Sequence, residues 1–301
     1  MRSFINRRDF LHYSATVAGL TALAPAFAAA AEPAPKRRLP KAIMWETAGV
    51  KGTILEKCRM IKEAGYEGIE PSSHMNQDEV VKALEATGLR AASVCCSTHW
   101  GKPASDPDPA VREAGLEGLK QALRDAKRYG TDVVLFVPAV VNKNVSYADA
   151  YTRSQETIRK ALPLAEELGV SIAIENVWNN FLLSPLEAAR YVDEFQSPRV
   201  GWYFDCGNIL NYGWPEQWIR ILGKRIKRVH IKEFSVKKAN KEGKGAGFGV
   251  PLLEGDNDWP AIMKALDAVG YSSWITSEQG GGGSLEGMRD LVSRMDRILA
   301  S

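Results

Sequence analysis

The chain has 301 residues, of which 45% are hydrophobic and 25% are charged, and it contains 26 glycines and 15 prolines. This composition is typical of a globular protein and excludes disordered, collagen-like and coiled-coil proteins. The formal net charge is only +3, and Arg2, Arg7, Arg8 and Asp9 give the first thirty residues most of it, so the nearly neutral remainder argues against nucleic acid as a partner.

The first thirty residues have the pattern of an export signal. Arg7 and Arg8 are followed by Phe10 and Leu11, by a short apolar stretch, and by small residues up to position 30. The apolar stretch is shorter than the ~20 residues that a membrane-spanning helix needs. We therefore expect residues 1–30 to be a signal peptide that resembles the leaders of the twin-arginine pathway, and the protein to be periplasmic or otherwise exported. An ordinary Sec signal with a chance arginine pair and an uncleaved membrane anchor are the alternatives.

A proline-rich basic segment follows the signal. Pro33, Pro35 and Pro40 surround the basic run 36–38, which is typical of a linker. We therefore expect a linker over residues 31–40 and a single folded domain over residues 41–301, with no membrane span in the mature chain.

The folded part alternates between short β-rich runs and amphipathic segments. In chain order, we expect strands at 42–45, 68–70, 90–95, 133–137, 171–175, 200–205, 228–231 and 273–277. The helices that we expect between and after them are 53–64, 77–87, 109–129, 147–168, 185–195, 216–222, 259–269 and 285–299. Many of these helices end in a glycine, as helices with a left-handed C-cap do: Gly65, Gly88, Gly130, Gly169 and Gly270.

Strict alternation of strands and helices predicts a parallel sheet, because each helix carries the chain back across the sheet. Eight such units predict a single (β/α)₈ TIM barrel. The competing fold is an open, doubly wound sheet. That fold usually has a glycine-rich phosphate turn after its first strand, and the sequence 46–49 has no such fingerprint.

The last four expected strands each end near a residue that can bind a metal ion: Glu175, Asp205, His230 and Glu278. The carboxyl ends of barrel strands meet at one mouth, so these side chains are expected to lie together. Three carboxylates and one imidazole suit one divalent Mn²⁺, Mg²⁺ or Co²⁺ ion, and less specifically Zn²⁺. Ion pairs with neighbouring lysines and arginines are the alternative role for these residues.

Five sequence stretches carry a resemblance to a known family. They are I-A-I-E-N (172–176), Y-F-D-C-G-N (203–208), V-H-I-K-E (229–233), E-G-D-N-D-W (254–259) and G-Y-S-S-W-I-T-S-E (270–278). Together they resemble the xylose isomerase-like superfamily of TIM barrels, in particular its sugar phosphate isomerase/epimerase group. The resemblance implies that Glu175, Asp205, His230 and Glu278 bind one metal ion and that Glu175 and Glu278 also act as the acid/base pair.

Other polar residues near the expected mouth are candidates for substrate binding. The family often has a histidine three residues after the metal-binding aspartate, whereas this chain has Asn208, which can form hydrogen bonds but cannot carry a proton at neutral pH. Lys232 is expected to contact a substrate oxygen, with an ion pair at the rim as the alternative. His99 and Glu70 are candidates for hydrogen bonds to a sugar, and a loop histidine and an ion pair explain them almost equally well.

Two glycine-rich segments, 237–249 and 280–283, follow the last two strands, where TIM barrels often bind phosphate. We favour plain or flexible loops for both segments.

The sequence therefore predicts a metal-dependent sugar isomerase or epimerase. It removes a proton from a carbon next to a carbonyl, and the metal ion stabilises the resulting enediolate. A keto-sugar or keto-inositol lyase or dehydratase with the same metal site is the alternative, and a non-catalytic periplasmic sugar-binding protein is a weaker one. An apurinic-site endonuclease is disfavoured, because its histidine-rich metal cluster is missing from this sequence. The expected partner is a small sugar or keto-sugar rather than nucleic acid, and the sequence leaves a homo-oligomer open.

Overall fold

The computed structural model describes residues 37–301. The expected signal peptide and residues 31–36 of the expected linker lie outside the described residues. In the rest of that linker, Arg37 forms an ion pair with Asp267 and Leu39 is buried, so this stretch packs against the domain. Among the helices described over 37–301, none is long and apolar enough to cross a membrane.

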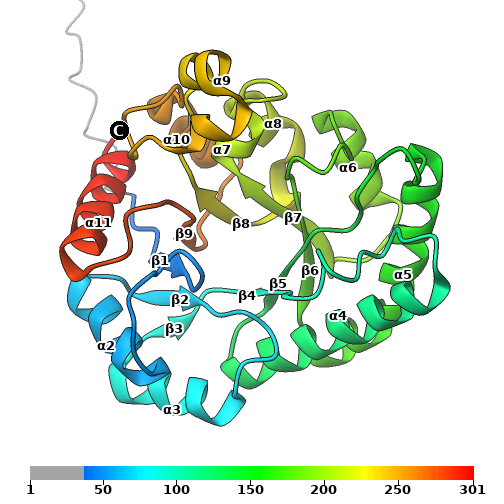
Figure 1. The fold of residues 1–301 in the computed structure, drawn as a ribbon, viewed down its shortest axis with the longest axis horizontal. Coiled ribbons are helices and arrows are strands. Elements are labelled where there is room, and N and C mark those ends of the chain that lie inside the picture. Colours follow the sequence, from blue (N-terminus) through cyan, green and yellow to red (C-terminus); the bar gives the residue numbers. More distant parts are fainter. Residues whose placement is uncertain (1–36) are drawn as a thin grey trace, which may run out of the picture. The chain divides into compact units, whose positions relative to one another are not determined.

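All neighbouring strands of the sheet are parallel. In chain order the strands are β1 (Lys41–Met44), β2 (Gly68–Glu70), β3 (Arg90–Ala91), β4 (Val94–Cys95), β5 (Val133–Phe136), β6 (Ser171–Glu175), β7 (Val200–Asp205), β8 (Ile226–Ile231) and β9 (Ile275–Ser277). Their order in the sheet is β3-β2-β1-β9-β8-β7-β6-β5-β4. Figure 1 shows these strands around a common centre with the helices outside them, which confirms the predicted TIM barrel.

The sheet has nine strands in the described residues because the expected strand 90–95 is interrupted. Ala92 N–H donates to the carbonyl of Ile69, but Cys95 N–H donates to the carbonyl of Pro71. Three steps along one segment therefore match two steps along the other, which is a bulge that the sequence pattern did not predict. An isolated bridge between Ser72, just after β2, and Cys95 in β4 continues the pairing beyond the bulge. It joins the segment after β2 to β4, which is at the opposite end of the sheet order from β3.

The helices surround the sheet. They are α2 (Ile54–Ala64), α3 (Gln77–Thr87), α4 (Pro109–Tyr129), α5 (Tyr147–Leu168), α6 (Pro185–Asp193), α7 (Cys206–Ile209), α8 (Pro215–Leu222), α9 (Val236–Glu242), α10 (Trp259–Ala268) and α11 (Leu285–Leu299), with 3₁₀ turns η1 (Gly223–Arg225) and η2 (Lys244–Phe248). Helices α3, α4, α5 and α11 begin and end at the expected residues. Helix α6 ends two residues earlier than expected, and the sequence analysis missed α7, α9 and both 3₁₀ turns, which are short and have weak periodicity.

Local capping explains why several predicted helix ends are accurate. Thr53 forms a capping box with Glu56 at the start of α2. The side chain of Ser184 caps α6, which begins with Pro185. Gly130 ends α4 with a φ of 76°, a conformation that favours glycine.

The amino-terminal end of the barrel is closed by the buried side chain of Arg228, on β8. Its Nε donates to the carbonyl of Ala92 over 2.6 Å, and its Nη1 donates over 2.8 Å to both Ser273 Oγ and the carbonyl of Lys227. Nη2 forms an ion pair with Asp132. Each nitrogen of this guanidinium therefore has a partner, and the interrupted strand contributes one of them.

Candidate metal centre

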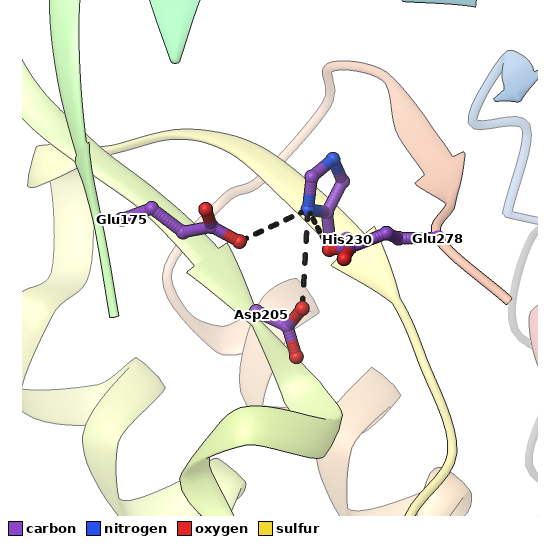
Figure 2. A group of neighbouring side chains, drawn as sticks. All are labelled: Glu175, Asp205, His230 and Glu278. Carbon is purple, nitrogen blue, oxygen red and sulfur yellow. Dashed lines mark hydrogen bonds and ion pairs between the residues drawn. The ribbon is translucent and has the colours of Figure 1, made fainter. Parts of the chain in front are cut away.

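Four potential metal ligands converge at the carboxyl end of the barrel. Glu175 ends β6, Asp205 ends β7, His230 lies near the end of β8, and Glu278 directly follows β9. These strands are neighbours in the sheet, and Asp205 pairs with His230 in the register of β7 and β8. One ligand atom from each residue lies within 4.8 Å of the others (Figure 2). The structure thus brings together all four residues that the sequence singled out.

Asp205 is held by the turn that follows its strand. It is the N-cap of α7, and its Oδ1 accepts a hydrogen bond of 2.7 Å from the backbone N–H of Asn208. Its other oxygen, Oδ2, is buried and has no hydrogen-bond partner within residues 37–301. Lys232 Nζ lies 3.6 Å from Oδ2 and forms an ion pair with it. The capping turn therefore aims one unsatisfied carboxylate oxygen into the cluster.

The ring of His230 is completely buried and faces carboxylates on both sides. Nδ1 lies 2.9 Å from Glu278 Oε2 and 3.3 Å from Glu175 Oε1. It lies 3.9 Å from Asp205 Oδ2. On the opposite side of the ring, Nε2 lies 3.1 Å from Glu70 Oε1. Nδ1 is therefore the ring nitrogen that faces the candidate metal centre.

The carboxylates differ in how easily they ionise. Burial raises the pKa of Glu175, and burial also raises the pKa of Asp205 to about 8. Burial opposes the ionisation of Glu278 as well, but the positive charge of Lys232 and the hydrogen bond from His230 outweigh it and lower the pKa of Glu278. A bound cation would stabilise the ionised forms of Glu175 and Asp205 and reduce the repulsion between the carboxylates.

Lys232 lies at the same mouth as the four potential ligands. Its Nζ donates a hydrogen bond of 2.7 Å to Glu278 Oε1 and lies 4.8 Å from the centre of the Phe248 ring. Burial opposes the charged form, but the carboxylates of Asp205 and Glu278 raise the pKa of Lys232. The predicted contact with a substrate oxygen stays a prediction, and the structure places Lys232 where such a contact is available beside Glu278.

Asn208 lies directly behind the metal centre. Its Nδ2 donates to the carbonyl of Asn176 over 2.8 Å, and its own carbonyl accepts a hydrogen bond of 3.1 Å from Trp178 Nε1. The side chain of Asn176 in turn accepts hydrogen bonds from Trp202 Nε1 and from the backbone N–H of Asp205. These amides join the ends of β6 and β7, a role that the sequence analysis did not assign to them.

Glu70 lies at the end of β2 with no exposed surface. Its Oε2 accepts hydrogen bonds from Ser93 Oγ and Tyr203 OH, and its Oε1 faces His230 Nε2. The sugar contact of Glu70 stays a prediction, and both carboxylate oxygens have partners inside the barrel, including His230, as the alternative of an ion pair implied. Serine at 93 reaches Glu70 from the bulge between β3 and β4, which explains why the sequence pattern gave no sign of this contact.

His99 is buried beside the end of β5. Its Nδ1 accepts a hydrogen bond of 3.3 Å from the backbone N–H of Val137, and its ring packs edge-on against Trp100 and Phe136. Burial lowers the pKa of His99 to about 4. His99 is therefore neutral at pH 7, which permits the predicted hydrogen bond to a sugar.

An aromatic cluster stands at the mouth beside Lys232. The rings of Trp178 and Phe248 are 4.8 Å apart, and those of Phe234 and Phe248 are 4.9 Å apart. Phe248 comes from the 3₁₀ turn η2, in the glycine-rich segment that we expected to be a loop. Phe234 and Phe248 have no distinguishing pattern in the sequence, and therefore this cluster was not predicted.

A second buried carboxylate, Glu233, anchors the loop between η2 and α10. Its Oε2 accepts hydrogen bonds from the backbone N–H of Leu253 and from Trp259 Nε1. Its Oε1 accepts from both the backbone and the side chain of Asn257. A Cβ at Gly255 would lie 2.5 Å from Glu233 Oε1, so only glycine fits there. The sequence analysis quoted this loop as a motif without finding its anchor.

The residues at the mouth fit a divalent metal ion. The ligand set combines hard carboxylate oxygens with one imidazole nitrogen, as Mn²⁺, Mg²⁺, Co²⁺ and Zn²⁺ sites do. The buried, unpartnered Oδ2 of Asp205 points to the same conclusion, because a buried polar atom without a partner is costly unless a ligand satisfies it.

Similar proteins are known. L-ribulose-5-phosphate 3-epimerase UlaE of Escherichia coli O1:K1 / APEC is 25% identical over 231 residues, which cover 72% of this chain and 78% of that protein. The fold is similar to 3-keto-D-glucoside 4-epimerase YcjR of E. coli, with a TM-score of 0.73, 19% identity and coverage of 86% of this chain and 99% of that one. It is also similar to the IOLI protein with a binding zinc atom, with a TM-score of 0.72, 15% identity and coverage of 87% and 98%.

The sequence model of one family matches residues 58–297, which form most of the barrel and include all four potential metal ligands. The chain belongs to the xylose isomerase-like TIM barrel family.

Proposed function

We propose that this protein is a metal-dependent sugar isomerase or epimerase. The observation that carries the proposal is the convergence of Glu175, Asp205, His230 and Glu278 at one buried point of the barrel mouth. Two of the similar proteins are sugar epimerases by name, and the name of a third includes a bound zinc atom. The substrate class that follows is a sugar or keto-sugar with a carbonyl next to the reacting carbon.

The acid/base work falls to Glu175 and Glu278. Glu175 ends β6 and Glu278 follows β9, with β7 and β8 between them, so their carboxylates approach the centre from opposite sides (Figure 2). One carboxylate removes a proton from one face of the reacting carbon. Return of a proton to the other face inverts that carbon. Return to the adjacent carbonyl carbon, together with transfer of the hydroxyl proton to the carbonyl oxygen, interconverts aldose and ketose. General acid/base catalysis of this kind contributes typically about 10²–10⁴-fold to the rate.

The neighbouring side chains bind and orient the substrate. Lys232 donates to substrate oxygens beside Glu278, and His99 offers a neutral imidazole. The aromatic cluster of Trp178, Phe234 and Phe248 provides an apolar surface on which the C–H face of a sugar packs. Glu175, Asp205, His230 and Glu278 hold one Mn²⁺, Mg²⁺, Co²⁺ or Zn²⁺ ion, which, when bound, supplies positive charge for the developing enediolate.

Deuterium exchange tests this function directly. The protein is incubated with Mn²⁺ in D₂O with free keto- and aldo-sugars, their phosphates and 3-ketoglucosides, and NMR locates any deuterium. Deuterium on one carbon of a recovered isomeric sugar is the expected result. Loss of a hydroxyl or of an aglycone would instead identify the lyase or dehydratase. Metal-independent sugar binding without exchange would identify a binding protein.

Two variants connect the exchange to the proposed residues. Glu175→Gln and Glu278→Gln keep the side-chain volume but remove the base, so each is expected to slow exchange by about 10²–10⁴-fold. Glu254→Gln is the matched control, because Glu254 is an exposed glutamate whose carboxylate pairs with Arg294, away from the candidate metal centre. Near-wild-type exchange in Glu278→Gln would refute the assignment of the acid/base pair.

We also propose that the protein is exported through the twin-arginine pathway. The support is the sequence of residues 1–30, with its paired arginines and short apolar stretch. The double variant Arg7→Lys and Arg8→Lys keeps the charge but removes the guanidinium groups. Cell fractionation is expected to find the wild type outside the cytoplasm and the double variant inside it. Equal export of both would point to a Sec signal.

A further inference from the structure

Beneath the candidate metal centre, three buried polar side chains that the proposed chemistry does not use form a network with the metal ligand His230. Glu70, Ser93, Tyr203 and His230 come from four different segments of the sheet, and each is completely buried. Tyr203 OH and Ser93 Oγ both donate to Glu70 Oε2, and the two hydroxyl oxygens lie 3.0 Å apart. Such a network is stable only when its members satisfy one another.

The network reaches the metal centre through one contact. Glu70 Oε1 lies 3.1 Å from His230 Nε2, while His230 Nδ1 faces Glu175 and Glu278. A carboxylate can only accept a hydrogen bond from this ring, so it requires a hydrogen on Nε2. Without a cation, Nδ1 also donates to Glu278, so a cation that binds the ring replaces the hydrogen on Nδ1 while Glu70 retains the one on Nε2. The tilted ring of Tyr203, 4.4 Å from the centre of the His230 ring, restricts its rotation further.

We propose that Glu70 is a positioning residue for the metal centre, and that Tyr203 and Ser93 hold it in place. It fixes the rotation of the His230 ring and keeps the hydrogen on Nε2, so that Nδ1 points at the cation. This inference rests on the proposed metal-dependent function, because in it Glu70 orients the metal ligand His230 and does not bind the sugar. Hydrogen-bond partners of metal-binding histidines typically change metal affinity about 10–100-fold when they are removed.

The test measures Mn²⁺ binding by isothermal titration calorimetry, without any substrate. Glu70→Gln keeps the volume and one acceptor oxygen but loses the charge, and we expect it to bind Mn²⁺ about 10–100-fold more weakly than the wild type. Tyr203→Phe leaves the contact between His230 and Glu70 intact and removes one donor that holds Glu70, so a smaller loss is expected. If Glu70→Gln does not fold, Tyr203→Phe carries the test.

Asp125→Asn is the matched control. Asp125 is also a completely buried carboxylate with hydrogen bonds to its neighbours, but its partners are the backbone of His74 and the side chains of Gln77 and Gln121, none of which belongs to the metal centre. Asp125→Asn is expected to lower the thermal stability and to keep the wild-type Mn²⁺ affinity. An equal loss of affinity in this variant would show that Glu70→Gln acts through stability alone and would overturn the proposal.

A spectroscopic measurement reports on the ring itself. With diamagnetic Zn²⁺ bound and ¹⁵N-labelled histidine, the wild type is expected to give a slowly exchanging Nε2–H resonance for His230. Glu70→Gln should move this resonance upfield, because a neutral amide is a weaker acceptor than a carboxylate.

The other outcomes are also decisive. Wild-type Mn²⁺ affinity in Glu70→Gln, with or without a raised KM for sugar, would overturn the positioning role, and the raised KM would support the sugar contact predicted from sequence. A wild-type protein that binds no divalent ion would remove the proposed function together with this inference. A wild type that binds Mn²⁺ but catalyses no exchange would overturn only the proposed reaction.

Discussion

At the amino-terminal end of the barrel, each nitrogen of the buried Arg228 guanidinium has a partner, whereas at the carboxyl-terminal end the buried Asp205 Oδ2 has none among the described residues. Both groups lie on the central strands β7 and β8. Burial therefore does not explain the difference. The buried charge at one end closes the barrel, and at the other end a buried carboxylate oxygen without a hydrogen bond is available to a ligand, as is common in functional sites.

The largest effect is expected at the amino-terminal end. Arg228→Met keeps an unbranched side chain but removes every hydrogen bond of the guanidinium, so we expect the free energy of unfolding to fall by about 3–4 kcal/mol. Urea denaturation measures this change, and the Mn²⁺ affinity should stay within about twofold of the wild type. A loss of Mn²⁺ binding equal to that of a ligand variant would show that the two ends are not independent.

His99 lies near the carboxyl-terminal end of the barrel, and its burial makes the free energy of unfolding depend on pH. Its pKa is lowered from 6.5 to about 4 by burial, so the unfolded chain takes up this proton before the folded protein does. The contribution of neutral His99 to the free energy of unfolding is fully present above pH 6.5. It decreases by about 3 kcal/mol as the pH falls from 6.5 toward 4.

The measurement is the difference between the wild type and His99→Asn, since Asn keeps an acceptor for Val137 N–H but does not titrate in this range. Between pH 7 and pH 4 the wild type should lose about 3 kcal/mol more than the variant. Parallel stability curves for the two proteins would contradict the buried, neutral state of His99.

Glu233 tests whether every carboxylate near the mouth is unsatisfied. Its oxygens accept hydrogen bonds from the backbone of Leu253, from Asn257 and from Trp259. Glu233→Gln replaces one acceptor oxygen with an N–H₂ group, which cannot accept a hydrogen bond from these donors. We therefore expect the free energy of unfolding to fall by about 2 kcal/mol. The control Glu254→Gln alters an exposed ion pair and should change stability by less than about 0.5 kcal/mol. Equal effects of the two substitutions would remove Glu233 as the anchor of this loop.

The smallest effect on stability is expected at Asp205. Asn keeps the Oδ1 that caps α7 and replaces only Oδ2, which has no hydrogen-bond partner among the described residues, so Asp205→Asn should change the metal-free stability by less than about 1 kcal/mol. The rise in Tm on addition of Mn²⁺ should disappear, since binding to the folded state alone produces it.

Asp132→Asn is the counterpart of Asp205→Asn at the other end of the barrel. It weakens the ion pair with Arg228 and should lower the stability while it leaves the Mn²⁺-induced rise in Tm intact. A loss of several kcal/mol in Asp205→Asn would contradict the difference between the ends.

Much of the barrel could be predicted from local signals. Caps such as Thr53 with Glu56 and glycines such as Gly130 act within one turn of chain, and therefore the ends of α2 and α4 were predicted to within a residue. The interrupted strand 90–95 could not be predicted, because its bulge depends on pairing with β2, far away in sequence. The short helices α7 and α9 have too few residues for a helical period to emerge.

The site divides in the same way. Glu175, Asp205, His230 and Glu278 could be predicted to meet, because the carboxyl ends of adjacent parallel strands share one edge and the chain order gives the strand order. The partners of Glu70 and Glu233 could not be predicted, since both depend on which way a side chain points inside the barrel and on loops that approach from other strands.

The sequence by itself therefore determined the alternation of strands and helices and the set of side chains at the strand ends, because both follow from periodicity and local capping. Only the tertiary structure decided which ring nitrogen of His230 faces the carboxylates and that Asp205 Oδ2 has no hydrogen-bond partner among the described residues. Those features depend on distances between segments far apart in the chain, and a one-dimensional pattern does not contain such distances.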